Sequence, residues 1–321
     1  MSKALQEIPP VIKKRHAHAN LLMRNVRQYP LLYVMCSVGV VWFIIFRYIP
    51  MGGLAIAFQN FRLAKGLFGS KWVGFKNFIR FFNDPYCFRI IRNTFLIAFY
   101  SLIWGFPAPI LLALSINELQ NQRFKRVAQS MSYLPHFVST VVVIGLLQMI
   151  TASDGIINSL LVKPFTGGRA ILFMSRPEWF RTLYVGSGIW QHVGWSSIIY
   201  LAAISGIDPQ LYEAAKIDGA GRLQCIFRIT LPVIMPTIKV LLILRMGQLF
   251  RVGFEKVYLM YSPATYETAD VLSTYVYRVG ILGGQDFSFA AAIGFFESMI
   301  SLVMIVGANY MSKKISGEGI Y

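Results

Sequence analysis

The stretch that decides the fold class is residues 208–232, which read DPQLYEAAKIDGAGRLQCIFRITLP. Asp208 is a good helix N-cap, and Pro209 fits the first helical position. Gly219 and Gly221 can both take left-handed backbone conformations, which end a helix. The stretch therefore predicts a short helix, a tight turn and a second helix.

One face of the first helix is built for close contact. Leu211, Ala214, Ala215 and Asp218 fall on the same side by three-to-four spacing, and the two alanines let that side approach another surface closely. Such a face suits docking into a cleft of a cytoplasmic partner. An ordinary interfacial loop helix is the alternative interpretation.

Long apolar runs flank this stretch on both sides. The chain has 321 residues, of which 55% are hydrophobic and only 14% are charged, and its mean hydropathy is +0.54. A soluble domain carries about 25% charged residues. We therefore predict an all-α membrane protein with six transmembrane helices of about 20 residues each, at 31–50, 94–116, 130–150, 184–204, 232–250 and 288–310.

The orientation follows from lysines and arginines near the span ends. The segment 1–30 is basic, and no small-x-small cleavage site follows the apolar run behind it, so we interpret that run as the first span rather than a signal peptide. The loop after the second span and the tail 311–321 are also basic. With six spans, both termini and the 205–231 loop fall on the cytoplasmic side. The basic side chains are Lys13, Lys14, Arg15, Arg24, Arg27, Arg123, Lys125, Arg126, Lys313 and Lys314.

The net charge of +17 does not indicate nucleic-acid binding, because the chain has no basic recognition helix or aromatic-basic sheet motif. The first external loop, 51–93, is itself basic and carries only Asp84 as an acid. It could attract an anionic solute, or it could be a solvated face in contact with headgroups. The cysteines Cys36, Cys87 and Cys225 lie far apart, so we expect packing roles and no metal site.

Prolines fall at unusual places inside the predicted spans. Pro107 and Pro109 lie in the second, Pro135 lies near the start of the third, and Pro232 and Pro236 open the fifth. Proline removes a backbone donor and kinks a helix. In a bilayer such breaks survive where protein or a water-filled cavity satisfies the freed carbonyls. This favours a bundle with an internal pathway.

The 213–232 segment resembles the EAA loop of ABC importer permeases. The pattern is Glu-Ala-Ala, three residues, Gly, nine residues and Ile-x-Leu-Pro, filled by Glu213, Ala214, Ala215, Gly219, Ile229, Leu231 and Pro232. The resemblance implies the type I importer permease fold over 31–310. It also implies that this loop, with Asp218 on its contact face, forms a coupling helix in a groove of the ATPase subunit.

A second resemblance points to permeases of the polysaccharide and oligosaccharide type, including alginate importer permeases. It rests on the segments 48–51, 72–78 and 287–294. It implies a pair of unlike permeases, two ABC ATPase subunits and an extracytoplasmic solute-binding protein, assembled in the bacterial inner membrane. No Gly-Lys dipeptide occurs, so the chain has no P-loop. We therefore expect no enzyme activity and no cofactor in this chain, with ATP and Mg bound by the partner ATPases. The run 282–285 resembles part of the ABC ATPase signature but lacks its serine, and we interpret it as coincidence.

Polar residues inside spans are candidates for the solute pathway. In related sugar permeases the solute contacts lie on the spans before and after the EAA loop, which points to Gln191, His192 and Trp195 on the fourth span. Trp195 could stack on a sugar ring or simply pack as a core aromatic. His192 could bind a hydroxyl or carboxylate, or could bond a neighbouring helix.

On the fifth span Arg245, Gln248 and Arg251 are spaced by three, which predicts one shared helical face. Two guanidiniums in a pore would bind carboxylates bidentately, although snorkelling to headgroups is the alternative. We therefore predict import of an acidic, alginate- or uronate-like saccharide by alternating access. A neutral oligosaccharide is the second candidate. An ion-coupled secondary transporter would show an inverted repeat, and none is apparent.

Overall fold

The structure is a computed structural model that describes residues 27–250 and 252–316. Arg251 and the predicted basic residues before Arg27 lie outside this range. The chain divides into two units, one ending at Ala55 and one beginning at Ile56, and each is described by itself.

The first unit is helical along its described length. It holds α2 (Pro30–Phe43), the π-helical turn η2 (Ile44–Tyr48) and α3 (Ile49–Met51), and the 3₁₀ segment η3 (Gly52–Phe58) begins within it. None of the side chains of α2, η2 or α3 is buried. An apolar helix with no buried face of its own is stable against lipid or another chain, which agrees with the predicted first span.

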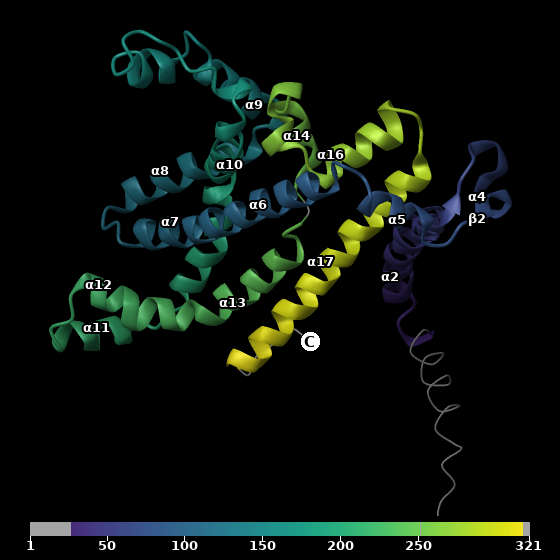
Figure 1. Ribbon diagram of the computed structural model, residues 1–321. Coiled ribbons are helices and arrows are strands. Elements are labelled where there is room, and N and C mark those ends of the chain that lie inside the picture. Colours follow the sequence, from purple (N-terminus) through teal and green to yellow (C-terminus); the bar gives the residue numbers. More distant parts are fainter. Residues whose placement is uncertain (1–26, 251, 317–321) are drawn as a thin grey trace, which may run out of the picture. The chain divides into compact units, whose positions relative to one another are not determined.

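The second unit contains all the other described elements (Figure 1); labels with η denote short 3₁₀ or π segments. In chain order they are β1 (Gln59–Asn60), η4 (Leu63–Lys65), α4 (Gly66–Gly69), β2 (Lys71–Trp72), α5 (Lys76–Phe82), α6 (Cys87–Gly105), α7 (Pro107–Asn117), α8 (Gln122–Tyr133), η5 (Leu134–Phe137), α9 (Thr140–Thr151), η6 (Asn158–Val162), η7 (Phe173–Ser175), α10 (Pro177–Ser205), α11 (Pro209–Ile217), α12 (Arg222–Cys225), η8 (Ile226–Thr230), α13 (Leu231–Gly247), α14 (Phe254–Met260), η9 (Pro263–Thr265), α15 (Tyr266–Ala269), α16 (Leu272–Tyr277), η10 (Arg278–Leu282) and α17 (Phe287–Ser316).

The structure does not confirm six transmembrane helices. Four helical stretches in the described range are long and apolar enough to cross a bilayer, namely Pro30–Phe58, Cys87–Asn117, Arg222–Gly247 and Phe287–Tyr310. Gln122–Phe137 and Thr140–Thr151 are separated by a short break with a bend of 102°. They add a fifth span if the bent pair counts as one. The helix expected at 184–204 exists as α10, with 29 residues. It is not among these stretches because serines, glycines and polar residues dilute its apolar content.

Prolines interrupt two of the helical stretches where the sequence predicts a break. α6 ends at Gly105, and α7 begins at Pro107 after a single intervening residue. The third expected span is broken near Pro135, since α8 passes into the 3₁₀ turn η5 and Val138 is extended. α9 then restarts behind Ser139, whose side chain accepts a hydrogen bond from Val142 N. The fifth expected span instead starts early, because α12, η8 and α13 follow one another without a break from Arg222 (Figure 1).

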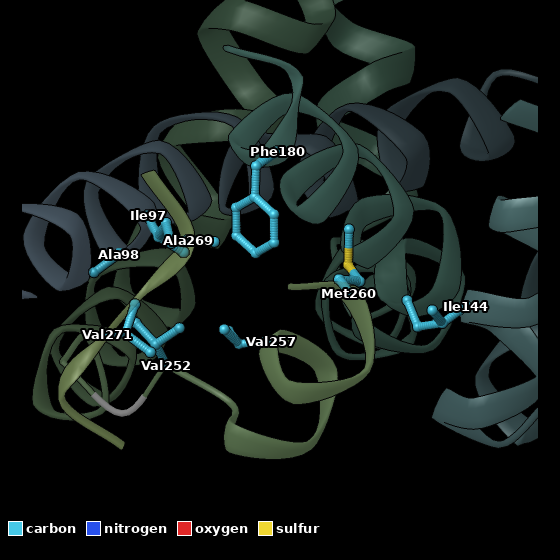
Figure 2. Packing of buried hydrophobic residues seen from close by; sticks show 9 residues of the cluster. All are labelled: Ile97, Ala98, Ile144, Phe180, Val252, Val257, Met260, Ala269 and Val271. Carbon is cyan, nitrogen blue, oxygen red and sulfur yellow. The ribbon is translucent and has the colours of Figure 1, made fainter. Parts of the chain in front are cut away.

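α10 is the centre of the packing in the second unit, where it contacts α6, α7, α8 and α13. Gly194 makes one of these contacts possible, because a Cβ at this position would lie 1.9 Å from the carbonyl oxygen of Ser132 on α8. One buried cluster, shown in Figure 2, joins α10 to α6, α9, α14 and the chain around residue 270. Another joins α10 to α7 and α13 through Tyr200, Ile204 and Ile234.

The buried carboxylate of Asp270 stabilises the segment before α16. Asp270 is fully buried and accepts two hydrogen bonds from the Arg278 guanidinium, at 3.2 and 2.6 Å. The Nη2 atom of Arg89 on α6 lies 3.6 Å from the same carboxylate, and Asn93 on α6 donates to the Asp270 carbonyl oxygen. These contacts tie the residues after α15 to α6.

Candidate functional site

A cleft of about 870 Å³ lies along α10. Its lining comes from α6, α7, the η5–α9 junction, α10, α13 and α14. The volume falls within the range of about 300–1,000 Å³ that is usual for small-molecule sites. The polar and aromatic side chains that face it include Ser101, His136, Thr140, Tyr184, Gln191, His192, Trp195, Ser196, Tyr200, Arg245 and Lys256.

An aromatic and imidazole group forms one wall of the cleft. The rings of His136 and Trp195 are stacked, with centroids 4.6 Å apart and planes 5° from parallel. His136 Nδ1 lies 3.1 Å from His192 Nδ1. One ring donates this hydrogen bond and the other accepts it, so at least one imidazole is neutral in this arrangement. Trp195 remains 45% exposed, so its ring can also meet a ligand.

The cleft is cationic. Arg245 in the last turn of α13 and Lys256 on α14 both line it, and the described lining includes no aspartate or glutamate. His136 and His192 line the same cleft. Together these groups create a region of positive charge that would attract an anionic solute.

Lys256 is the most enclosed of these cations. Its Nζ donates a hydrogen bond to the Tyr184 carbonyl oxygen at 2.8 Å and lies 4.8 Å from the centre of the Tyr184 ring. A Cβ at Gly188 would come within 3.1 Å of this ammonium, so the absence of a side chain there makes room for it. Burial lowers the pKa of Lys256 from its ordinary value to about 8.

The structure brings together most, but not all, of the predicted pathway residues. His192, Trp195 and Arg245 line the cleft with exposed side chains, and Gln191 lines it although it is nearly buried. Gln191 donates its amide to the Val138 carbonyl oxygen at 2.9 Å, which fixes the broken helix junction to α10. The predicted face shared with Gln248 is wrong, because α13 ends at Gly247 and Gln248 is its C-cap. Arg251 lies outside the described residues.

Sequence reasoning missed several residues of the cleft, among them His136, Tyr184 and Lys256. His136 could have been found from the sequence, because it directly follows Pro135 and is therefore a polar ring beside a predicted helix break. Tyr184 and Lys256 gave no such signal, because their contact joins positions 72 residues apart.

The 208–232 segment folds as two short helices around a tight turn. Asp208 caps α11, and its side chain accepts a hydrogen bond from Gln210 N at 2.9 Å. Gly219 has φ +77°, so the turn uses the left-handed conformation that its sequence predicts. The same expectation is wrong for Gly221, which is extended with φ −75° and ψ 167° because it is the N-cap of α12.

The predicted coupling residues are largely exposed. Glu213, Ala214, Asp218 and Gly219 are exposed, and α11 has no buried residue. Among the coupling residues after the turn, Pro232 is exposed, whereas Ile229 and Leu231 are partly buried against the α7–α10–α13 core. Large apolar side chains of this segment are also open to solvent, namely Leu211, Ile217, Leu223 and Phe227, at 47%, 86%, 69% and 65%. An exposed apolar set of this kind faces a partner chain or lipid, since Leu223 and Phe227 also belong to the apolar stretch Arg222–Gly247.

Tyr212 anchors this surface to the helices. Its hydroxyl lies 2.9 Å from the hydroxyl of Thr230, which is buried in η8, and its ring packs against the cluster of α7, α10 and α13. Tyr212 therefore links α11 to α7, α10 and α13. The sequence did not single out this residue.

Comparison with known proteins agrees with the fold. Residues 105–317 match the family described as "Binding-protein-dependent transport system inner membrane component". The chain is 45% identical over 315 residues to the polygalacturonan/rhamnogalacturonan transport system permease protein YteP of Bacillus subtilis (strain 168), covering 98% of this chain and 97% of that protein. It is 43% identical over 291 residues to protein LplB of the same strain, covering 90% and 91%.

Two solved structures are similar over nearly the whole chain. One is a crystal structure of a bacterial ABC transporter involved in the import of the acidic polysaccharide alginate, with a TM-score of 0.84 and 44% identity over 92% of this chain and 99% of that one. The other is of the bacterial alginate ABC transporter in complex with an alginate pentasaccharide-bound periplasmic protein, with a TM-score of 0.84 and 43% identity over 93% and 99%. The cleft, the exposed loop and these likenesses agree: the chain belongs to the family of binding-protein-dependent transport system inner membrane components, the permease subunits of ABC importers.

Proposed function

We propose that this chain is a permease subunit of an ABC importer for acidic oligo- or polysaccharides, and that the cleft along α10 is its solute pathway. The observation that carries the proposal is the charge of the cleft. Arg245 and Lys256 line it together with two histidines, and no acid is present in the described lining. Sugar carboxylates would supply the missing negative charges through charge-assisted hydrogen bonds.

The aromatic wall supports a sugar rather than a simple anion. The outer face of the stacked Trp195 ring offers an apolar surface to the C–H face of a pyranose. Tyr184, Thr140 and the two imidazoles offer hydroxyl and nitrogen partners for its hydroxyls. Similar relatives are named for polygalacturonan and rhamnogalacturonan and for the acidic polysaccharide alginate, and galacturonan is by its chemistry a polymer of a carboxylated sugar.

The proposed assembly follows the family. The chain would pair with a second, unlike permease subunit in the bacterial inner membrane with both termini in the cytoplasm, and a solute-binding protein would deliver the sugar. Two ATPase subunits would bind ATP and Mg. We propose that they grip the exposed α11 surface, where Glu213 is open and Ala214 and Ala215 allow close approach. Alternating access would then move the cleft between the two sides without breaking a bond in the sugar.

The test is ATPase stimulation of the reconstituted complex by charged and neutral sugars of equal length. We expect trigalacturonate and an alginate trimer to stimulate hydrolysis and maltotriose to stimulate it weakly. Arg245→Gln or Lys256→Gln should raise the half-saturating concentration of the charged trimers about tenfold to a hundredfold, because each removes a hydrogen bond to a charged group worth about 1.5–3 kcal/mol.

Arg169→Gln provides a control, since Arg169 is an exposed cation that does not line the cleft. It should leave both half-saturating concentrations within about a factor of two, as expected for a surface change worth under about 0.5 kcal/mol. Equal stimulation by charged and neutral trimers, unaffected by either cleft variant, would refute the acidic assignment and favour a neutral oligosaccharide.

Lys256 also predicts a pH dependence. Its pKa is about 8, so the ammonium loses its proton as pH rises through that value, and transport of an acidic sugar should fall there. Lys256→Arg should keep its charge and move the decline to higher pH, because a guanidinium stays protonated up to about pH 12. The free energy of unfolding responds to pH in the opposite direction. Between about pH 8 and 10.5 the unfolded chain keeps the Lys256 proton that the folded chain has lost, so the contribution of Lys256 to stability increases as pH rises through this range. Identical pH profiles of transport for the unaltered protein and Lys256→Arg would contradict a role for the Lys256 ammonium in sugar binding.

A further inference from the structure

A second cavity, of about 470 Å³, lies between α6 and α10. Val185 and Ile189 line both this α6–α10 cavity and the cleft. The two hollows are therefore neighbours on one side of α10. The residues that belong to the α6–α10 cavity alone are Tyr100, Trp104, Glu178, Arg181, Thr182 and Gly186.

Together the two linings run the length of a membrane crossing. On α10 they extend from Glu178 to Tyr200, a rise of about 33 Å at 1.5 Å per residue. The hydrocarbon core of a bilayer is about 30 Å thick. In the proposed orientation the Glu178 end lies outside, so the α6–α10 cavity is where a sugar would arrive before it reaches Arg245 and Lys256.

The Arg181 guanidinium lines the cavity and forms no ion pair within 4.0 Å among the described residues, although the Glu267 carboxylate is near enough to act on it electrostatically. Arg181 gives one hydrogen bond, from Nη2 to Asn93 Oδ1 at 3.0 Å, and its buried Nε has no acceptor in the described part of the chain. Arg89 and Arg278 differ, because both pair with Asp270. A guanidinium in this position is short of acceptors, and a carboxylate is the group that satisfies it best.

The other lining groups select for a sugar. Trp104 and Tyr100 are 64% and 37% exposed, so both present aromatic surface against which a pyranose ring can lie. Glu178 lines the same cavity and forms no ion pair with Arg181 within 4.0 Å in the described range. Its carboxylate can accept hydrogen bonds from hydroxyls, and it disfavours a ligand that is mainly negative charge, such as a phospholipid headgroup.

We propose that the α6–α10 cavity is an entry subsite for one carboxylated sugar unit, in which Arg181 binds the carboxylate, Trp104 lies against the ring and Glu178 accepts a hydroxyl. The proposal rests on the proposed function, because it assumes that the sugar moves from this cavity into the cleft.

The experiment is protection of single cysteines from maleimide labelling in the full complex with its ATPase subunits, in phosphatidylcholine nanodiscs without binding protein. Thr182→Cys reports the cavity and Ser196→Cys reports the cleft, in a background where the exposed Cys36 is serine; Cys87 and Cys225 are buried. We expect trigalacturonate, but not maltotriose, to slow labelling at both positions.

Arg181→Gln should raise the trigalacturonate concentration for half-maximal protection of Thr182→Cys about tenfold, the effect of losing one charge-assisted hydrogen bond. Trp104→Leu should raise it as well. Arg169→Gln is the control, because Arg169 is an exposed guanidinium outside the lining, and it should change nothing. Unchanged protection of Ser196→Cys in the Arg181→Gln background shows that the variant is folded.

The outcomes separate the two proposals. Protection at Ser196→Cys without protection at Thr182→Cys overturns the entry subsite and leaves the proposed function standing. Protection at neither position overturns both. Equal protection of Thr182→Cys by maltotriose overturns recognition of the carboxylate. Protection without sugar in phosphatidylglycerol nanodiscs identifies a lipid headgroup as the occupant and overturns the subsite.

Discussion

Replacing Asp270 with asparagine is expected to destabilise the folded chain by about 3–5 kcal/mol, the usual effect of removing one partner from a buried ion pair. Asp270 is fully buried and holds both oxygens against the Arg278 guanidinium. Asparagine has nearly the same shape but no charge, so Arg278 and the nearby Arg89 would be left without their counter-ion. The measurement is the free energy of unfolding of the solubilised protein in an SDS titration.

Asp286→Asn is the matched control. Asp286 pairs with Arg80 at an exposed position, where the two side chains are 34% and 58% exposed, and exposed ion pairs contribute about 0–1 kcal/mol. Its side chain also accepts a hydrogen bond from Phe289 N at the start of α17, and asparagine preserves that cap. Equal losses in the two variants would contradict a special role for the buried carboxylate.

The asparagine variant also tests how the segment after α15 is held. Asp270 follows α15 directly, and Asn93 of α6 donates to the carbonyl oxygens of Glu267 and Asp270. Thr94 of α6 accepts the Leu272 N–H at the start of α16. If the ion pair is the main fastening, protease cleavage within 261–286 should appear first in Asp270→Asn.

The sequence was sufficient for the helical class and for the location of most long helices, because apolar runs report burial in lipid directly. It also located α10, predicted at 184–204 and observed at Pro177–Ser205. This helix is less apolar than the candidate spans, because it packs against protein on several sides and lines the cleft. Pro107 and Pro135 correctly marked breaks, since a missing donor acts locally. The angle of 102° between Gln122–Phe137 and Thr140–Thr151 depends on tertiary contacts such as Gln191 to Val138, which no local pattern encodes.

Some residues of the candidate site could also be predicted from the sequence, and others could not. His192, Trp195 and Arg245 were accessible to sequence reasoning because a polar residue in an apolar run is conspicuous. Lys256 was not, because a lysine between spans has many solvated positions and only the fold brings it to Tyr184. Gln248 was misplaced because helical spacing was extended past Gly247, where α13 ends.

Gly219→Val is expected to lower sugar transport per ATP hydrolysed about tenfold while leaving the helices assembled. Gly219 has φ +77°, a left-handed conformation that costs a residue with a side chain roughly 1–2 kcal/mol, equivalent to a factor of about 5–30. A Cβ there would meet no atom within 4 Å, so the cost is conformational and not steric. The turn it closes includes the bond from Ala220 N to Ala215 O at 2.8 Å, which positions the end of α11.

Gly221→Ala separates this effect from a general change of the loop. Gly221 is exposed, like Gly219, but its φ of −75° suits any residue. Transport per ATP should therefore stay within about a factor of two, the range for an unstrained surface change. The readout is sugar accumulation against phosphate release in proteoliposomes, with retention of the ATPase subunits on the purified permease measured in parallel. The proposed relay runs from α11 through Tyr212 to Thr230 and the core of α7, α10 and α13. A strained turn should therefore let ATP hydrolysis proceed without moving the cleft. Equal transport by Gly219→Val and the unaltered protein would refute that relay, whereas loss of the ATPase subunits would identify the turn as part of the docking surface itself.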